Sequence, residues 1–218
     1  MTRIELGKKY GNGLGIEVGA FHNPWPVPGK VTYADKKTRA ELFAQFPECQ
    51  HKPIVETDII TSAETLEGVD TESFDFLCSS HVLEHMENPL SAIENWLRVV
   101  KPGGHLMIAV PDKRFTFDRG RRVTSYEHLL GEYLYPGTVA DNRIFHLIEY
   151  FVRVDKNDIE VALKRAREMP KDADIHFHCW DEQVLNEMFE KFSELVKTFK
   201  IVEWFLNGQE VILVLEKL

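Results

Sequence analysis

Short apolar runs alternate with polar or amphipathic stretches over the first 112 residues of the chain. A short apolar run bounded by glycine, proline or acidic residues predicts a buried strand, and apolar positions three or four apart predict a helix. This pattern predicts helices near 37–46 and 89–99. It predicts strands near 14–18, 31–35, 54–57, 74–79 and 105–110. Strands that alternate with helices favour a mainly parallel sheet of the α/β class.

The end of the chain has a different pattern, a helix followed by two strands. Asp181 is a suitable N-cap for a helix over 182–197, which has a clear apolar face. Two apolar runs follow, at 199–205 and 211–217, and the turn between them contains Asn207-Gly208. An Asn-Gly pair between two strand-like runs predicts an antiparallel hairpin.

Residues 113–175 interrupt the alternation of strands and helices. They contain two helix-like stretches, roughly 124–135 and 141–168, and no strand-like run. The segment follows the fifth predicted strand, on the side of an open α/β sheet where ligands bind. We therefore expect a single domain over 1–218 with a helical lid or substrate-recognition insertion at about 113–175.

Composition limits the classes of partner and compartment. The chain has 218 residues, of which 44% are hydrophobic and 28% charged, enough for one buried α/β core. Its formal net charge of −9 argues against a nucleic acid partner. Cys49, Cys78 and Cys179 show no metal-site spacing, and sparse cysteines fit a reducing compartment. With no signal-peptide pattern and no apolar run of membrane-spanning length, we expect a cytoplasmic protein without a membrane partner.

Four motifs occur in a fixed order along the predicted strands. Glu17 lies in the first strand, Gly19 follows that strand, and Asp35 ends the second. The third carries Asp58, and residues 83–89 after the fourth read Leu-Glu-His-Met-Glu-Asn-Pro. A Lys-Pro-Gly-Gly turn then precedes the fifth strand.

In this order the motifs resemble those of the class I S-adenosylmethionine-dependent methyltransferases, in the branch with a Leu-Glu-His-x-x-x-Pro pattern. The resemblance covers about residues 12–112 and, more loosely, the terminal hairpin. It implies a three-layer Rossmann-like fold with a mainly parallel seven-stranded sheet of order 3-2-1-4-5-7-6 and a C-terminal antiparallel hairpin. It also implies S-adenosyl-L-methionine as the cofactor.

The resemblance places the cofactor contacts at the strand ends. Glu17 would fix the cofactor loop, Asp35 would accept both ribose hydroxyls, and Asp58 would meet the adenine amine. The other implied contacts are Gly19, Ala20, Phe21, His22, Asn23, Ile59, Ser79, Ser80 and His81. Because Phe21 stands where the family has its second glycine, the loop must leave room for the cofactor by another path.

Three histidines are the candidates for acid–base chemistry. A histidine titrates near neutral pH and can take the proton of an acceptor hydroxyl. His81 ends the fourth strand, while His176 and His178 share one side of an extended segment. A structural role for each is the alternative. For the substrate, the candidates are Arg114, Asp118 and Arg119, because guanidinium groups bind phosphate or carboxylate bidentately.

His81, Glu84 and His85 also have a spacing with which some relatives hold a divalent ion. The Leu-Glu-His pattern is equally frequent in relatives without a metal, so we expect no metal site. The sequence thus predicts an S-adenosylmethionine-dependent methyltransferase that O-methylates a small polar or anionic acceptor containing sugar or phosphate. A non-catalytic protein that binds the adenosyl cofactor and an NAD-dependent Rossmann enzyme are the alternatives. The terminal hairpin and the altered glycine turn disfavour the NAD-dependent enzyme.

Overall fold

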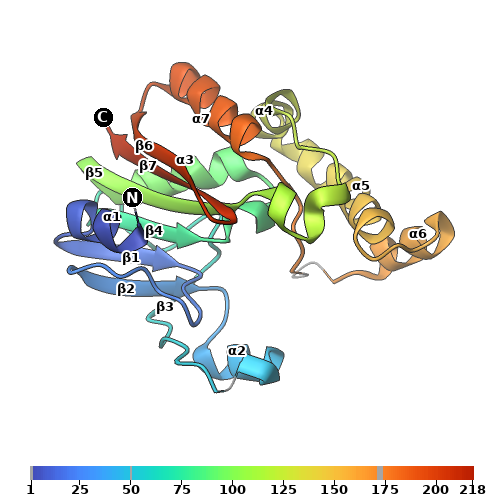
Figure 1. Ribbon diagram of the computed structural model, residues 1–218, viewed down its shortest axis with the longest axis horizontal. Helices are drawn as coiled ribbons and strands as arrows, with labels where there is room; N and C mark the ends of the chain where they lie inside the picture. Colours follow the sequence, from blue (N-terminus) through green and yellow to red (C-terminus); the bar gives the residue numbers. More distant parts are fainter. Residues whose placement is uncertain (1, 50, 171–173) are drawn as a thin grey trace.

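The computed structural model describes residues 2–49, 51–170 and 174–218, and a twisted seven-stranded sheet runs through its centre (Figure 1). The strands are β1 (Leu14–Val18), β2 (Lys30–Asp35), β3 (Ile59–Ile60), β4 (Phe74–Ser80), β5 (Val100–Pro111), β6 (Phe199–Asn207) and β7 (Glu210–Lys217). Their order across the sheet is β3-β2-β1-β4-β5-β7-β6. Strand β7 runs antiparallel to both of its neighbours, β5 and β6, and the other pairs of described strands are parallel. The predicted fold class, sheet order and terminal hairpin are therefore confirmed.

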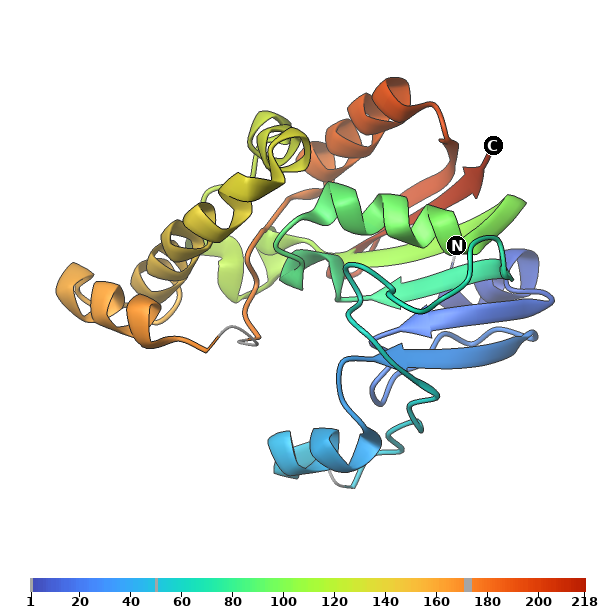
Figure 2. The same cartoon turned by 180° about the vertical axis from the view of Figure 1, so that it is seen from behind.

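Helices cover both faces of the sheet, and a group of them extends beyond it. They are α1 (Arg3–Tyr10), α2 (Arg39–Gln45), α3 (Pro89–Val99), α4 (Tyr126–Leu134), α5 (Val139–Arg153), α6 (Ile159–Glu168) and α7 (Glu182–Val196). The helices α3 and α7 pack on one face, whereas α1 packs on the other. Seen from behind, α5 and α6, coloured yellow to orange, project away from the sheet (Figure 2). None of the described helices is long and apolar enough to cross a membrane.

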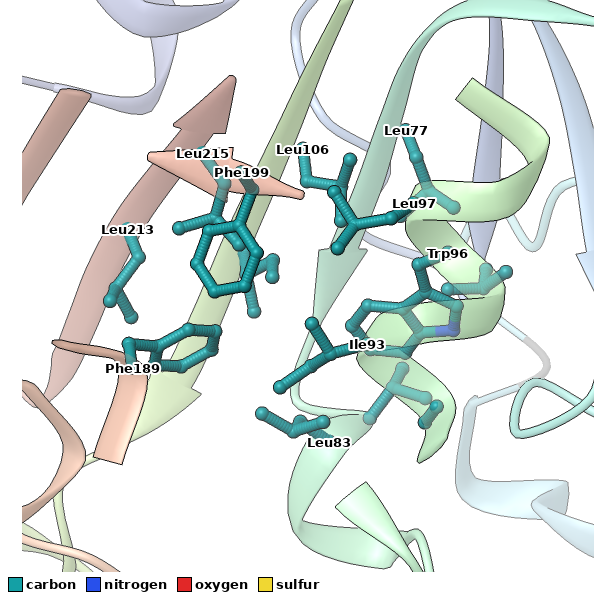
Figure 3. Close-up of a cluster of buried hydrophobic side chains, with 14 of the residues drawn as sticks. Leu77, Leu83, Ile93, Trp96, Leu97, Leu106, Phe189, Phe199, Leu213 and Leu215 are labelled. Carbon is teal, nitrogen blue, oxygen red and sulfur yellow. The ribbon is translucent and has the colours of Figure 1, made fainter. Parts of the chain in front are cut away.

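The core follows from the two-residue period of the strands. Along β5, Leu106 and Ile108 belong to the cluster under α3 and α7, while Met107 and Ala109 face α1. Figure 3 shows the first cluster, where Trp96 of α3 lies among leucine, isoleucine and phenylalanine side chains. Both faces of the central strands are thus buried, which explains why their sequences read as nearly continuous apolar runs.

Three elements differ from the sequence predictions. The strand predicted at 54–57 is wrong, because the Val55 N–H donates to the carbonyl of Phe21 instead of joining β2. The strand that pairs with β2 is β3, which begins at Ile59. The predicted helix over 141–168 is two helices, α5 and α6, with Lys156 at a φ of 60° between them. Helix α1 was not predicted, although Thr2 and Glu5 form a capping box at its start.

Candidate active site

A cavity of about 540 Å³ opens at the carboxyl ends of β1, β2, β3 and β4. Its volume lies within the range of small-molecule and cofactor sites. Several lining residues were predicted from the sequence: Gly19, Ala20, Phe21, His22, Asn23, Asp35, Ser80 and His81. Others were not predicted as site residues, among them Lys36, Leu42, Gln45, Phe46, Ser62, Glu64, Val82, His85, Glu87, Asp174 and Phe177.

The loop after β1 is held from below by Glu17. This carboxylate is fully buried, and both of its oxygens accept the Trp25 N–H, at 3.0 and 3.1 Å. Burial raises the pKa of Glu17 to about 7, against the lowering effect of that backbone bond. Glu17 is not among the residues that line the cavity. It therefore fixes the loop from Gly19 to Trp25 through the Trp25 N–H, without forming part of the cavity lining.

The positive φ angles of Gly19 and Phe21 determine the backbone path of this loop. Gly19 has a φ of 66°, and a Cβ at this position would lie 2.6 Å from Cγ2 of Val82. Phe21 also has a positive φ, 49°, and its ring packs against Phe46 with centroids 5.2 Å apart. The aromatic ring thus turns toward α2, and the loop backbone remains at the cavity wall.

The acids predicted at the next two strand ends lie in different environments. Asp35 lines the cavity, where burial raises its pKa, and its Oδ1 accepts the Lys37 N–H at 3.1 Å. Asp58 is exposed, accepts the Tyr33 N–H at 2.9 Å and is not among the lining residues. Ile59 and Ser79 are not lining residues either. The structure therefore brings Asp35 to the cavity but not Asp58.

Glu84 lies at the centre of a cluster of histidines beside the cavity. It is 1% exposed, and neither carboxylate oxygen has a hydrogen-bond partner among the described residues. Its Oε1 lies 3.9 Å from His81 Nδ1, 3.9 Å from His85 Nε2 and 3.8 Å from His176 Nε2. Two of these three rings, those of His81 and His85, line the cavity. A buried carboxylate without a donor is costly unless something else satisfies it.

Second carboxylates hold the outer nitrogens of these rings. His176 Nδ1 hydrogen-bonds to Asp118 at 2.6 Å, and His81 Nε2 to Glu210 at 3.0 Å. His85 Nδ1 lies 2.9 Å from Asp174. The His85 contact lowers the pKa of Asp174 to about 2, against the effect of its burial. Burial alone would lower the pKa of His85, but Asp174 and Glu84 raise it above its usual value.

The other residues predicted to contact the substrate lie outside the cavity lining. Arg114 binds the buried carboxylate of Asp112 and also Glu182, at 3.1 Å from Oε2. Arg119 is exposed and does not line the cavity. Asp118 is buried and orients His176. His178 is buried in a separate cluster with His128, Glu132 and His146.

Comparisons with known proteins identify the family of the chain. The profile of a family described as "Methyltransferase domain" matches residues 27–193, so the chain belongs to that family. Together with the sheet order, this confirms the class I S-adenosylmethionine-dependent methyltransferases as its class, with S-adenosylmethionine as the cofactor.

Two curated relatives match parts of the chain. A mitochondrial ubiquinone biosynthesis O-methyltransferase of Dictyostelium discoideum is 41% identical over 44 residues, 20% of this chain. An uncharacterized protein of Methanocaldococcus jannaschii is 30% identical over 113 residues, 51% of this chain. These matches cover 14% and 52% of the relatives' own lengths.

Solved structures share the fold at low sequence identity. A protein of Methanococcus maripaludis, assigned as an S-adenosyl-L-methionine-dependent methyltransferase, has a TM-score of 0.51 at 12% identity, over 99% of this chain and 83% of its own. A SAM-dependent methyltransferase of Thermotoga maritima has a TM-score of 0.50 at 17% identity, over 94% and 81% of the two chains. At these identities the likeness concerns the fold alone.

Proposed function

We propose that this protein transfers the methyl group of S-adenosylmethionine to an oxygen of a small polar acceptor that binds beside Glu84. The observation that carries the proposal is the unpartnered carboxylate of Glu84 with His81, His85 and His176 within 3.9 Å, next to the cavity. Hydroxyl groups are donors and acceptors, so an acceptor with a hydroxyl can satisfy both the carboxylate and the rings.

The cofactor fits the half of the cavity formed by the β1 and β2 ends. The Gly19 to Asn23 loop provides backbone at the cavity wall, where a Cβ at Gly19 would collide with Val82. The carboxylate of Asp35 accepts both ribose hydroxyls, and Ser80 and His81 lie near the methionine part. Glu17 acts from behind by holding the Trp25 N–H.

S-adenosylmethionine supplies a methyl group made electrophilic by its sulfonium. The protein's part is to place the acceptor oxygen in line with that methyl carbon and to take the hydroxyl proton. His176 is the base, because Asp118 accepts from Nδ1 and leaves Nε2 as the proton acceptor, as in other carboxylate–histidine pairs. The O–C bond forms as the C–S bond breaks, and the proton ends on His176 Nε2.

The acceptor is polar, and no arginine needs to bind it. Arg114 is neutralised by Asp112 and Glu182, so its expected role as an anion clamp does not enter the proposal. Lys36 is the cation that lines the cavity. The O-methyltransferase from Dictyostelium among the relatives supports oxygen as the acceptor atom.

Two measurements test these assignments. Isothermal titration should show binding of S-adenosylhomocysteine, weakened at least about 10-fold in Asp35→Ala because two ribose hydroxyls lose their acceptor. Asp58→Ala, at an exposed carboxylate outside the cavity lining, should bind like the wild type. Absence of binding to the wild-type chain would contradict the cofactor site, and equal affinities in both variants would remove Asp35 from it.

Transfer of labelled methyl groups to a panel of phenols, sugars and sugar phosphates tests the acceptor site. His176→Gln should reduce turnover about 100-fold or more while leaving cofactor affinity nearly unchanged. The control is His105→Gln, on β5, which packs against Tyr10 instead of the cavity. Equal turnover in His176→Gln and the wild type would contradict the proposed base.

A further inference from the structure

A second cluster of histidines lies among the helices that follow β5. His128 and Glu132 lie one turn apart on α4, His146 lies on α5, and His178 belongs to the extended segment before α7. None of these four residues lines the cavity. Two consecutive helices and a segment well beyond them in the sequence therefore converge on one point that the proposed methyl transfer does not use.

The distances between their side-chain atoms match one face of a tetrahedron. His128 Nε2 lies 3.1 Å from His146 Nε2, and these atoms lie 3.3 and 3.5 Å from Oε1 of Glu132. An ion with tetrahedral bonds of about 2.0–2.1 Å holds its ligand atoms about 3.3–3.4 Å apart. The His178 ring completes the group, with Nε2 at 3.9 Å from Glu132 Oε2. Because the Glu87 carbonyl accepts from Nε2 at 3.3 Å, Nδ1 is the nitrogen whose lone pair is left for an ion. One ligand atom from each residue lies within 4.8 Å of all the others.

Burial makes this cluster costly without an ion. Glu132 is 1% exposed and His178 is 0% exposed. Glu132 Oε2 and His178 Nδ1 have no hydrogen-bond partner among the described residues.

Two neighbouring amide side chains hold Glu132, one at its carboxylate and one at its main-chain carbonyl. Asn142 Nδ2 donates to Glu132 Oε1 at 3.0 Å, and Asn88 Nδ2 donates to the Glu132 carbonyl at 3.1 Å. Trp180 stacks on the His178 ring with centroids 5.8 Å apart. Hydrogen bonds and packing of this kind around the ligands are typical of metal sites, where they fix the orientation of each side chain.

We propose that His128, Glu132, His146 and His178 bind one Zn²⁺, or a divalent transition ion of similar preference. Three imidazole nitrogens and one carboxylate oxygen form a borderline donor set that suits zinc rather than Mg²⁺ or Ca²⁺, which favour oxygen ligands. Because four protein ligands complete a tetrahedron, the site is structural and leaves no open position. This proposal replaces the expectation, made from the sequence, that no metal is bound.

The ion would connect the insertion to the cavity wall. Phe177 precedes His178 and lines the cavity, and Glu87, another lining residue, places its carbonyl 3.3 Å from His178 Nε2. With α4, α5 and this segment held at one centre, the positions of Phe177 and the neighbouring His176 become fixed. The histidine-rich segment then serves both sites, His176 beside Glu84 and His178 at the ion.

The test is metal binding by the full chain. The protein is stripped with a chelator, loaded with Zn²⁺ and dialysed, and its metal content is measured by mass spectrometry. We expect one Zn²⁺ per chain, a rise in Tm when the ion is added to the stripped protein, and tetrahedral visible absorption bands with Co²⁺. His146→Gln and His128→Gln, both at partly exposed rings, should weaken Zn²⁺ binding at least about 100-fold.

His85→Gln is the matched control, because His85 belongs to the other cluster with Glu84 and His176. This variant should keep one Zn²⁺ per chain and the same Tm rise. A wild-type chain that retains no ion after dialysis would overturn the proposal. So would His146→Gln and His128→Gln variants that bind like the wild type, or loss of the ion only in His85→Gln. Circular dichroism of each variant separates loss of the ion from loss of the fold.

Discussion

Glu17 and Glu84 are both buried carboxylates near the cavity, but their partners differ. Both oxygens of Glu17 accept one backbone N–H. In the described part of the chain neither oxygen of Glu84 has a donor, and three imidazoles lie within 3.9 Å of it. A carboxylate that accepts a backbone N–H, as that of Glu17 does, holds a loop in place. One that is buried beside the cavity without a donor can take a substrate hydroxyl. The surroundings of each residue, more than its type, thus separate a supporting role from a chemical one.

The pKa of Glu17 predicts how stability depends on pH. Because burial raises its pKa in the folded chain from 4.5 to about 7, the folded state keeps a proton that the unfolded chain releases. The contribution of Glu17 to stability therefore falls as pH rises from about 4.5 to 7, by roughly 3 kcal/mol in total, and is level above that. In Glu17→Gln this contribution should vanish.

Urea unfolding at several pH values measures this effect as the difference in free energy of unfolding between the wild type and Glu17→Gln. That difference should decline across the window from pH 4.5 to 7. Glu67→Gln, at an exposed position, serves as the control and should run parallel to the wild type. A constant difference between Glu17→Gln and the wild type would mean that Glu17 is ionised throughout.

Among the elements, those with a strong local pattern were predicted well. Strand β1 and helix α3 have the predicted bounds, because apolar period and flanking glycine or proline define them locally. Strand β3 has only two residues and depends on pairing with β2, so nothing in its own sequence separates it from the preceding residues. The position of β3 is therefore determined by its tertiary contact with β2 and not by the strand propensity of its own residues.

In the candidate site too, features with a local sequence signal were predicted, and features that depend on tertiary contacts were not. The topology of an open sheet places Asp35 and His81 at carboxyl ends, and both line the cavity. The hydrogen bond between Asp118 and His176 joins residues 58 positions apart, and no local signal in the sequence reveals it. His176 and His178 were paired by strand-like alternation, yet they belong to two different clusters.

Arg121 fixes the segment that carries these histidines. Its guanidinium is almost fully buried and donates to Asp118, to Glu149 of α5 and to the carbonyls of His176 and Phe177. Arg121→Met should destabilise the protein by about 3–5 kcal/mol, because Asp118 would remain buried without its cation. Arg122→Met, at the exposed neighbouring position, should change stability by less than about 0.5 kcal/mol. Urea midpoints measure both, and similar values for the two variants would contradict the role of Arg121.

At the scale of the whole molecule, two hydrophobic cores meet at the cavity. The sheet packs against α3 and α7, whereas α5 and α6 share a separate cluster that includes Phe177. Phe177 and Asp174 line the cavity, and residues after β1, β2 and β4 supply its other wall, so we expect a bound cofactor to lie between the two parts. We propose that the described residues of the insertion, 113–170 and 174–175, form a cover whose opening is coupled to ligand binding.

Hydrogen exchange tests this coupling. A small separate core opens at lower free energy than the central sheet, so amides of α5 and α6 should exchange faster than those of β4 and β5 in the free protein. S-adenosylhomocysteine should slow exchange in α5 and α6, because the ligand joins the two walls, while β5 and β7 already exchange slowly and should change little. Mass spectrometry after pulses in deuterated buffer measures both sets of amides. Unchanged exchange over 139–168, with cofactor binding established by titration, would mean that the insertion is a fixed support and not a cover.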